Sequence, residues 1–207
     1  MVLLTLFVLL LRFGKLLNVV NYSHVLDILK DELLYTEKET CQRLIDALLH
    51  TISLKEHYNG GRVFIAAAGR SKMVANMFAM RLMHCGLLNV QVVGETTTAP
   101  ICRFDSLLLV SGSGETKQLI NFAEKAKSVR SEVLLVTASP TSTLRNIADE
   151  TFQIGPSSRV LSTDKNLPLG SRFELATMIF FETVILNIME QLKLTEDNLR
   201  DFHTNLE

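Results

Sequence analysis

The sequence predicts an α/β fold, a three-layer, doubly wound domain with a five-stranded parallel sheet behind a helical lead-in. From residue 63 onward, short apolar runs alternate with helical stretches, which is the pattern of repeated β-α-β units. Runs such as residues 107–110 do not alternate with polar side chains, so helices must cover both faces of the sheet. With 207 residues, 47% of them hydrophobic, the chain is long enough to bury this core as one domain.

The elements follow in order along the chain. A helical lead-in runs from residue 22 to about residue 57, because apolar residues recur there every three or four positions between charges. The chain then breaks at Asn59-Gly60-Gly61. We expect strands at residues 63–67, 90–93, 107–110, 133–136 and 152–154, and helices at about 72–85, 115–128, 142–148 and 172–192. The stretch 155–170 is long for a strand-to-helix loop, and such loops are commonly functional.

Composition excludes several classes of protein. The formal net charge of −1, from 21 basic and 22 acidic residues, leaves no basic footprint for binding nucleic acid. The three cysteines, Cys41, Cys85 and Cys102, are an odd number without C-x-x-C spacing, which argues against a disulfide framework or a zinc site. We therefore expect a cytoplasmic protein with no nucleic-acid partner and no bound metal.

An apolar extension, residues 1–21, precedes the expected domain of residues 22–207. Its aliphatic run, residues 2–11, is too short to cross a bilayer, which takes about 20 residues. Basic residues follow the run rather than precede it, unlike in a secretory signal. Three interpretations stay open: a helix in an oligomer interface, a start codon placed too far upstream, and a membrane-attached form.

A ligand site is expected where the strand order of the sheet reverses. For the flavodoxin-like order 2-1-3-4-5, that point lies beyond the carboxyl ends of the first and third strands. Small-residue turns open helices at both places, Gly69-Arg70-Ser71 and Ser111-Gly112-Ser113-Gly114-Glu115-Thr116-Lys117. Glycines admit a ligand to the backbone, helix N-termini attract anions, and hydroxyl groups donate hydrogen bonds. Neither turn fits a P-loop or a dinucleotide pattern, so a monophosphate is the predicted ligand, the alternative being turns that only connect elements.

These turns belong to a longer set of stretches that resembles the SIS (sugar isomerase) domain family from about residue 25 to the end. The other stretches, in the family's order, are Met80-Arg81-Leu82-Met83-His84, residues 93–98, residues 168–174 and residues 203–207. The resemblance implies interconversion of D-arabino-hex-3-ulose 6-phosphate and D-fructose 6-phosphate, in formaldehyde fixation by the ribulose monophosphate pathway. It also implies a homotetramer with no metal or organic cofactor.

Two residues depart from the family pattern. Lys72 stands where a small residue is common, and Arg172 where an aliphatic one is common. Each adds a long cation beside the predicted site, where it either strengthens phosphate binding or points to solvent.

Moving a carbonyl between neighbouring carbons requires a base, a proton carrier between the two oxygens, and stabilisation of the enediolate. The resemblance makes Glu174 the catalytic carboxylate, although a carboxylate in a first helical turn is also ordinary dipole complementarity. His84 and His203 are the candidates for the second proton carrier, with His84 ranked slightly ahead. Arg70 and Lys117 are candidate counter-charges for the phosphate.

Two competing functions remain at the level of sequence. One is a SIS isomerase that acts on a pentose or heptose phosphate. The other is a sugar-phosphate sensor that binds its ligand without turnover.

Overall fold

The computed structural model describes residues 22–36, 38–54, 60–155, 167–168 and 170–206. The apolar extension, residues 1–21, lies outside the described residues, as does most of the stretch 155–170. The interpretations of both segments therefore stay predictions.

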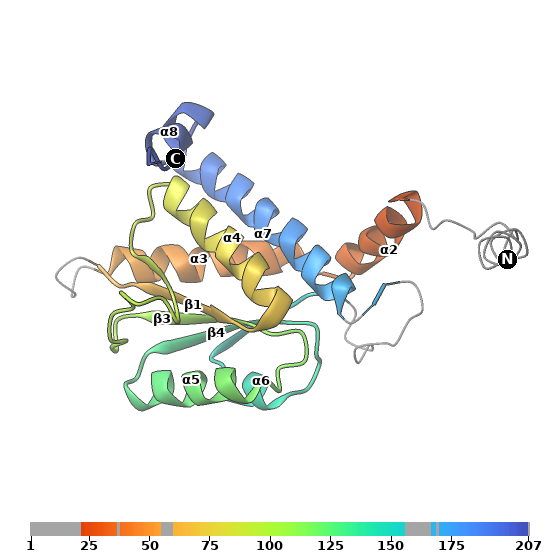
Figure 1. Ribbon diagram of the computed structural model, residues 1–207, viewed down its shortest axis with the longest axis horizontal. Coiled ribbons are helices and arrows are strands. Elements are labelled where there is room, and N and C mark those ends of the chain that lie inside the picture. The colour runs from red at the N-terminus through yellow and green to blue at the C-terminus, as the bar shows by residue number, and fades with distance from the viewer. Residues whose placement is uncertain (1–21, 37, 55–59, 156–166, 169, 207) are drawn as a thin grey trace, which may run out of the picture.

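A five-stranded parallel sheet forms the centre of the molecule, in the order β2-β1-β3-β4-β5 (Figure 1). The strands are β1 (Val63–Ala67), β2 (Val90–Val92), β3 (Ser106–Val110), β4 (Glu132–Thr137) and β5 (Glu150–Gln153). In the register, Val63 pairs with Val90 and with Ser106, so β1, β2 and β3 begin at one edge of the sheet, and β1 and β3 end together at the other. The predicted fold class and strand order are confirmed.

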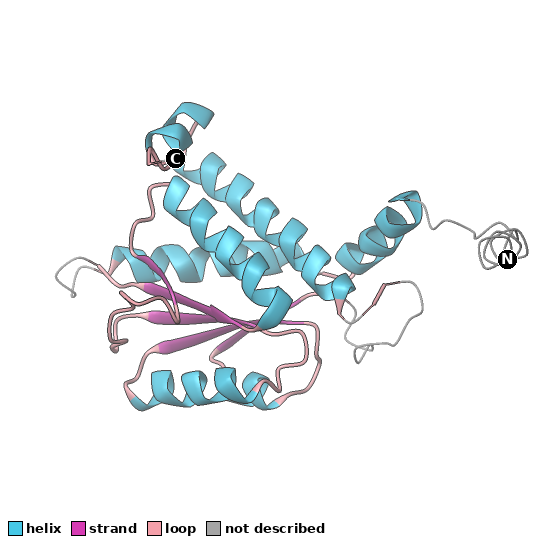
Figure 2. Cartoon of the chain, in the orientation of Figure 1, coloured by secondary structure: helices cyan, strands magenta, loops and turns pink. Residues whose placement is uncertain are grey.

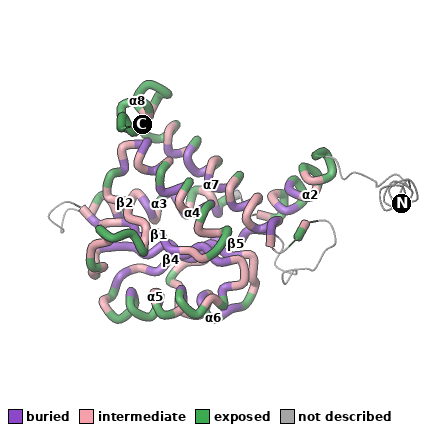
Figure 3. Tube along the Cα trace, in the orientation of Figure 1, coloured by how far each residue is buried: buried purple, intermediate pink, exposed green. Residues whose placement is uncertain are grey.

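Helices cover both faces of the sheet, which produces three layers (Figure 2). On one face lie α3 (Lys38–Ser53), α4 (Gly69–His84) and α7 (Ser171–Leu192), which share a core with alternate strand residues such as Ile65 and Leu108. On the other face, α5 (Lys117–Ser128) and α6 (Thr143–Ile147) pack on the intervening residues, such as Phe64 and Leu109. The strands are therefore buried on both sides, as their unbroken apolar sequence requires (Figure 3).

The helical lead-in is divided into two helices. The first, α2 (Tyr22–Leu34), packs against α7 and projects beyond the sheet, and α3 follows after a short break (Figure 1). The sequence pattern did not predict α8 (Glu196–Asp201), which begins with a capping box between Thr195 and Asn198.

Among the described residues, α7 is the one helix long and apolar enough to cross a membrane by length and composition alone. Most of its apolar side chains, however, belong to the core that α7 shares with α4. Phe181 stacks on Phe78 of α4 with ring centroids 4.0 Å apart. In this structure α7 is a core helix.

Candidate active site

A polar cavity of about 180 Å³ lies beyond the carboxyl ends of β1 and β3. This is the point at which the strand order reverses, where ligands of doubly wound sheets bind. Six predicted site residues line it, namely Ser71, Ser111, Gly112, Ser113, Thr116 and Glu174. The two predicted turns and the first turn of α7 thus meet in one place.

Three helix N-termini converge on this cavity. Ala68, Thr116 and Gly170, the residues immediately before α4, α5 and α7, all line it, and none makes a side-chain capping hydrogen bond. By contrast, Ser142 and Thr195 cap α6 and α8 with their side chains. An uncapped helix N-terminus presents backbone N–H groups and partial positive charge, so three of them together favour an anion.

The hydroxyl groups of the β3–α5 turn are held in place by backbone hydrogen bonds. Ser111 is buried, and its Oγ accepts from the N–H of Gly114 at 3.1 Å, while Ser113 Oγ accepts from the N–H of Glu115 at 3.3 Å. Because each hydroxyl acts as an acceptor in these contacts, its own O–H can donate to a ligand. The turn therefore offers oriented donors as well as helix N-termini.

Among the lining residues that the structure describes, one carries a carboxylate. Glu174, in the first turn of α7, accepts a hydrogen bond from Arg70 Nε at 2.7 Å, and its side chain is 12% exposed. Arg70 itself is 63% exposed and lies at the rim, so it can hold the carboxylate without blocking the cavity. Among the described residues, the site thus combines three uncapped helix N-termini with one positioned carboxylate.

Four other predicted contact residues lie close by without lining the cavity. Gly69 opens α4 with a φ of +57°, a conformation that favours glycine. Gly114 has a φ of +67°, and a side chain there would overlap Ser142. Glu115 accepts hydrogen bonds from the backbone N–H and hydroxyl of Thr143, which lower the pKa of its carboxyl. Lys117 is exposed at the start of α5. As ligand contacts, these four residues stay predictions.

The two histidine candidates lie together at the far end of α4. The rings of His84 and His203 stack with centroids 5.0 Å apart, and His84 is buried. Burial lowers the pKa of His84, and the positive charges of His203 and Arg81 lower it further. Thirteen helical steps separate Ser71 from His84, or about 20 Å along the axis, so neither ring reaches Glu174 within one chain.

The family model of the SIS domain, compared with this sequence, matches residues 58–178, which is more than half of the chain. The chain belongs to the SIS domain family. A Bacillus subtilis relative named 3-hexulose-6-phosphate isomerase is 36% identical over 89% of this chain and 96% of its own length. A Methylomonas aminofaciens relative of the same name is 37% identical over 71% of this chain and 81% of its own.

A solved structure extends the comparison. The crystal structure of a Methanococcus jannaschii protein, for which a 3-hexulose-6-phosphate isomerase function was inferred, matches with a TM-score of 0.73 and 33% identity. The match covers 88% of this chain and 98% of that one. The family and the enzyme class expected from the sequence, an isomerase, are confirmed.

Both residues that depart from the SIS pattern lie outside the cavity lining. The Lys72 ammonium lies beside Gly94, in the loop after β2. The Arg172 guanidinium pairs with Glu32 of α2, with Nη1 and Oε2 3.5 Å apart. Neither cation lines the cavity at the carboxyl ends of β1 and β3.

Four cavity residues were not among those predicted from the sequence: Ala68, Val110, Gly170 and Phe173. Gly170 and Phe173 fall inside one of the stretches that resemble the family, so that stretch was the available signal. Ala68 and Val110 are apolar residues at or after strand ends, and nothing in their type indicates a ligand. Their position follows from the parallel register of β1 and β3.

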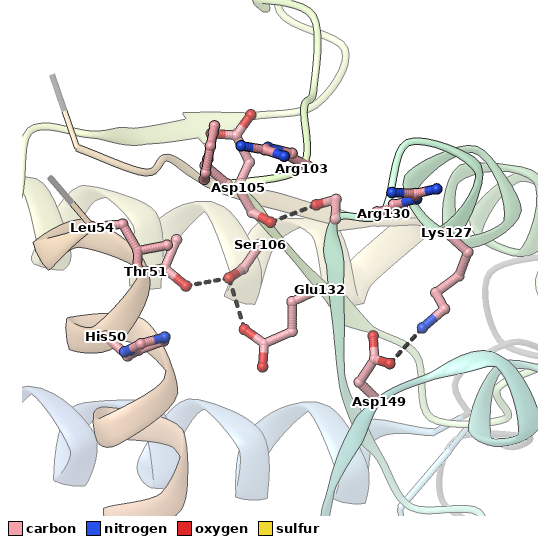
Figure 4. A pocket seen from close by; sticks show the side chains of 12 residues that line it. His50, Thr51, Leu54, Arg103, Asp105, Ser106, Lys127, Arg130, Glu132 and Asp149 are labelled. Carbon is pink, nitrogen blue, oxygen red and sulfur yellow. Dashed lines mark hydrogen bonds and ion pairs between the residues drawn. The ribbon is translucent and has the colours of Figure 1, made fainter. Parts of the chain in front are cut away.

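A larger cavity, of about 610 Å³, lies at the opposite edge of the sheet, where β3 and β4 begin (Figure 4). Ser106 there links Thr51 to Glu132 through its hydroxyl, and Lys127 pairs with Asp149. Ligands of doubly wound sheets bind at the carboxyl ends of the strands, which favours the smaller cavity as the active site. In the part of the chain that the structure describes, no group of three or more His, Cys, Asp or Glu side chains could hold a metal.

Proposed function

We propose that this SIS domain interconverts D-arabino-hex-3-ulose 6-phosphate and D-fructose 6-phosphate through an enediol intermediate. The names of relatives that match over most of the chain support this substrate. The observation that carries the proposal is the Glu174 carboxylate, held by Arg70 beside a cavity into which three uncapped helices point.

The phosphate binds at the helix N-termini in this proposal. The hydroxyls of Ser71, Ser111, Ser113 and Thr116 donate to its oxygens, and the dipoles of α4 and α5 stabilise its charge. A phosphate anchored in this way leaves the sugar carbons to extend along the cavity toward Glu174. The binding energy of a group that does not react then positions the carbons that do.

Glu174 performs the proton transfer between carbons. As a carboxylate, it removes the proton from C2 of the 3-ulose, and the electrons form the C2–C3 double bond of the enediolate. The second proton carrier takes the proton of the C2 hydroxyl and delivers one to the C3 oxygen. The Glu174 carboxylic acid returns its proton to C3 as the carbonyl forms at C2. Arg70 keeps the carboxylate oriented and contributes positive charge near the enediolate.

The second proton carrier comes from another subunit in this proposal. Met73, Met77 and Met80 form an exposed apolar stripe along α4, suited to contact with a second copy. If two α4 helices pack antiparallel with the twofold axis at Met77, residue 84 of one copy faces residue 70 of the other, because each lies seven positions from Met77. The His84 and His203 pair of one subunit would then adjoin the site of the next.

We also propose a cytoplasmic homotetramer that serves formaldehyde fixation by the ribulose monophosphate pathway. The antiparallel α4 contact supplies one interface of such an assembly. Sedimentation velocity measures the assembly directly, and Met77→Glu is expected to dissociate it and to lower turnover. Loss of the assembly with full turnover would contradict the shared site.

The decisive assay couples the formation of fructose 6-phosphate from hex-3-ulose 6-phosphate to NADPH production. Glu174→Gln is expected to lower turnover by about 10²-fold or more, because the amide cannot accept the carbon-bound proton. Glu150→Gln is the matched control, since Glu150 also pairs with an arginine, Arg43, at 2.8 Å but lies on β5 away from the cavity. Equal turnover in Glu174→Gln and Glu150→Gln would refute the assignment.

A substrate panel separates the competing functions. An isomerase of pentose or heptose phosphates turns over arabinose 5-phosphate or sedoheptulose 7-phosphate faster than the hexulose phosphate. A sensor is stabilised against thermal unfolding by sugar phosphates and forms no product from any of them.

A further inference from the structure

A buried acid on the projecting helix α2 reaches the first turn of α7. Glu32 pairs with Arg172, with Oε2 and Nη1 3.5 Å apart, and the two side chains are only 6% and 15% exposed. A buried ion pair is costly to break on one side, because the remaining charge keeps its burial and loses this contact.

Glu32 also lies against the start of the segment that leads into α7. Gly155, two residues after the end of β5, has a φ of +81°, and a side chain at this position would overlap the Glu32 carboxylate. The Gly155 N–H donates to Thr36 Oγ1, just beyond α2, at 3.3 Å. The α2 end of the molecule therefore contacts both Gly155, shortly after β5, and Arg172, in the first turn of α7.

Arg172 and Glu174 occupy opposite sides of the first turn of α7. Successive helical residues are turned by about 100°, so two positions differ by about 200°. Glu174 consequently faces the cavity and Arg70, while Arg172 faces α2. Phe173, between them, lines the cavity and is packed in the core.

We propose that the Glu32–Arg172 pair is a positioning device for Glu174, which fixes the first turn of α7 relative to the phosphate-binding turns. This inference builds on the proposed isomerase function. Proton transfer requires the base within about 3–3.5 Å of the reacting atom, and a displacement of about 1 Å costs about 100-fold in rate. The long cation of Arg172 thus acts on the reaction through the helix rather than on the phosphate.

The test is a double-mutant cycle with Arg172→Met, Glu32→Met and the double variant. Each single variant removes one side of the buried ion pair, so kcat is expected to fall about 10- to 100-fold with KM changed less than about twofold. The double variant removes both charges and is expected to recover most of kcat. Arg172→Lys, which keeps the charge, is expected to retain more activity than Arg172→Met.

Arg62→Met is the matched control, because Arg62 forms a similarly buried pair with Asp105 at the opposite edge of the sheet. Amide hydrogen exchange, read by mass spectrometry, provides the second measurement. Exchange in residues 171–176 is expected to accelerate in both single variants and to return toward the wild-type rate in the double variant. Arg62→Met is expected to leave that peptide at the wild-type rate.

Failure of the positioning role and failure of the proposed isomerase function give different results. If the wild-type protein does not isomerise hexulose phosphate, the proposed function fails, and hydrogen exchange alone decides whether the pair fixes α7. Unchanged exchange in the single variants would overturn the positioning role. A rise in KM at constant kcat would also overturn it, because Arg172 would then act in substrate binding.

Discussion

The packing of Gly112 against Phe173 predicts that one added methyl group will disturb the active site. Gly112 lies in the turn after β3, and a Cβ there would stand 2.9 Å from Cδ1 and 3.2 Å from Cγ of the Phe173 ring. Carbon atoms in contact prefer about 3.5–4.0 Å, so the ring must retreat by about 0.6–1 Å in Gly112→Ala. Phe173 is buried in the α4–α7 core, which leaves little room for that movement.

The overlap of the added methyl group with the Phe173 ring sets the size of the expected losses in stability and turnover. Overpacking of this kind costs about 1–3 kcal/mol, and each kcal/mol lowers Tm by about 2–4 °C in a protein of this size. The residue after Phe173 is Glu174, so a shift of the ring also displaces the proposed base. We therefore expect turnover to fall by about 10-fold or more, beyond the effect of lower stability.

Differential scanning calorimetry and the coupled isomerase assay measure both effects. Phe173→Leu, introduced into the Gly112→Ala background, removes ring atoms from the overlap and is expected to restore part of both Tm and turnover. Gly112→Ala with wild-type Tm and turnover would refute the packing argument. An additive loss in the double variant would show that the two residues do not interact.

Two further predictions concern pH. Burial, His203 and Arg81 lower the pKa of His84, so between that pKa and about 6.5 the folded protein binds fewer protons than the unfolded chain. The free energy of unfolding should therefore fall from pH 7 to pH 5.5. Urea titrations should show a smaller fall in His84→Gln than in the wild type. An identical fall in both proteins would contradict the role of His84. Burial raises the pKa of Glu132, and the negative charges of Asp149 and Glu150 raise it further, while the hydrogen bond from Ser106 lowers it. Because the pKa is raised overall, the folded protein binds more protons than the unfolded chain. Stability is therefore lost as pH rises from about 4.3 through that raised pKa. Glu132→Gln should thus gain stability over wild type at pH 7 and not at pH 4, and a gain of equal size at both would exclude ionisation as the cause.

The sequence predicted the sheet well because short apolar runs and the small residues of the turns mark each strand locally. The run 63–67 is bounded by glycines and small residues, and the observed β1 has those bounds. The turns after β1 and β3 also located the cavity, since parallel strands bring their carboxyl ends to one edge. The short helix α8 was missed because one leucine among five polar residues carries no apolar period.

The sequence did not determine the directions of individual side chains. Glu115 lies in the predicted turn, yet its carboxylate accepts hydrogen bonds from Thr143 and does not line the cavity. Arg172 appeared beside the site, but its partner Glu32 lies 140 positions away in the chain. Likewise, nothing local shows that His84 and His203 stack together at the far end of α4. Such contacts depend on tertiary packing between distant segments.

The most direct test is the crystal structure of Glu174→Gln, which is expected to bind without turnover, in complex with fructose 6-phosphate. The phosphate should accept hydrogen bonds from the turns at Ser71 and at residues 111–116, with C2 and C3 of the sugar within about 3.5 Å of the residue 174 side chain. A sugar phosphate bound at the opposite edge of the sheet, beside Glu132, would contradict the proposed site. So would a phosphate in the predicted place whose reacting carbons lie out of reach of residue 174.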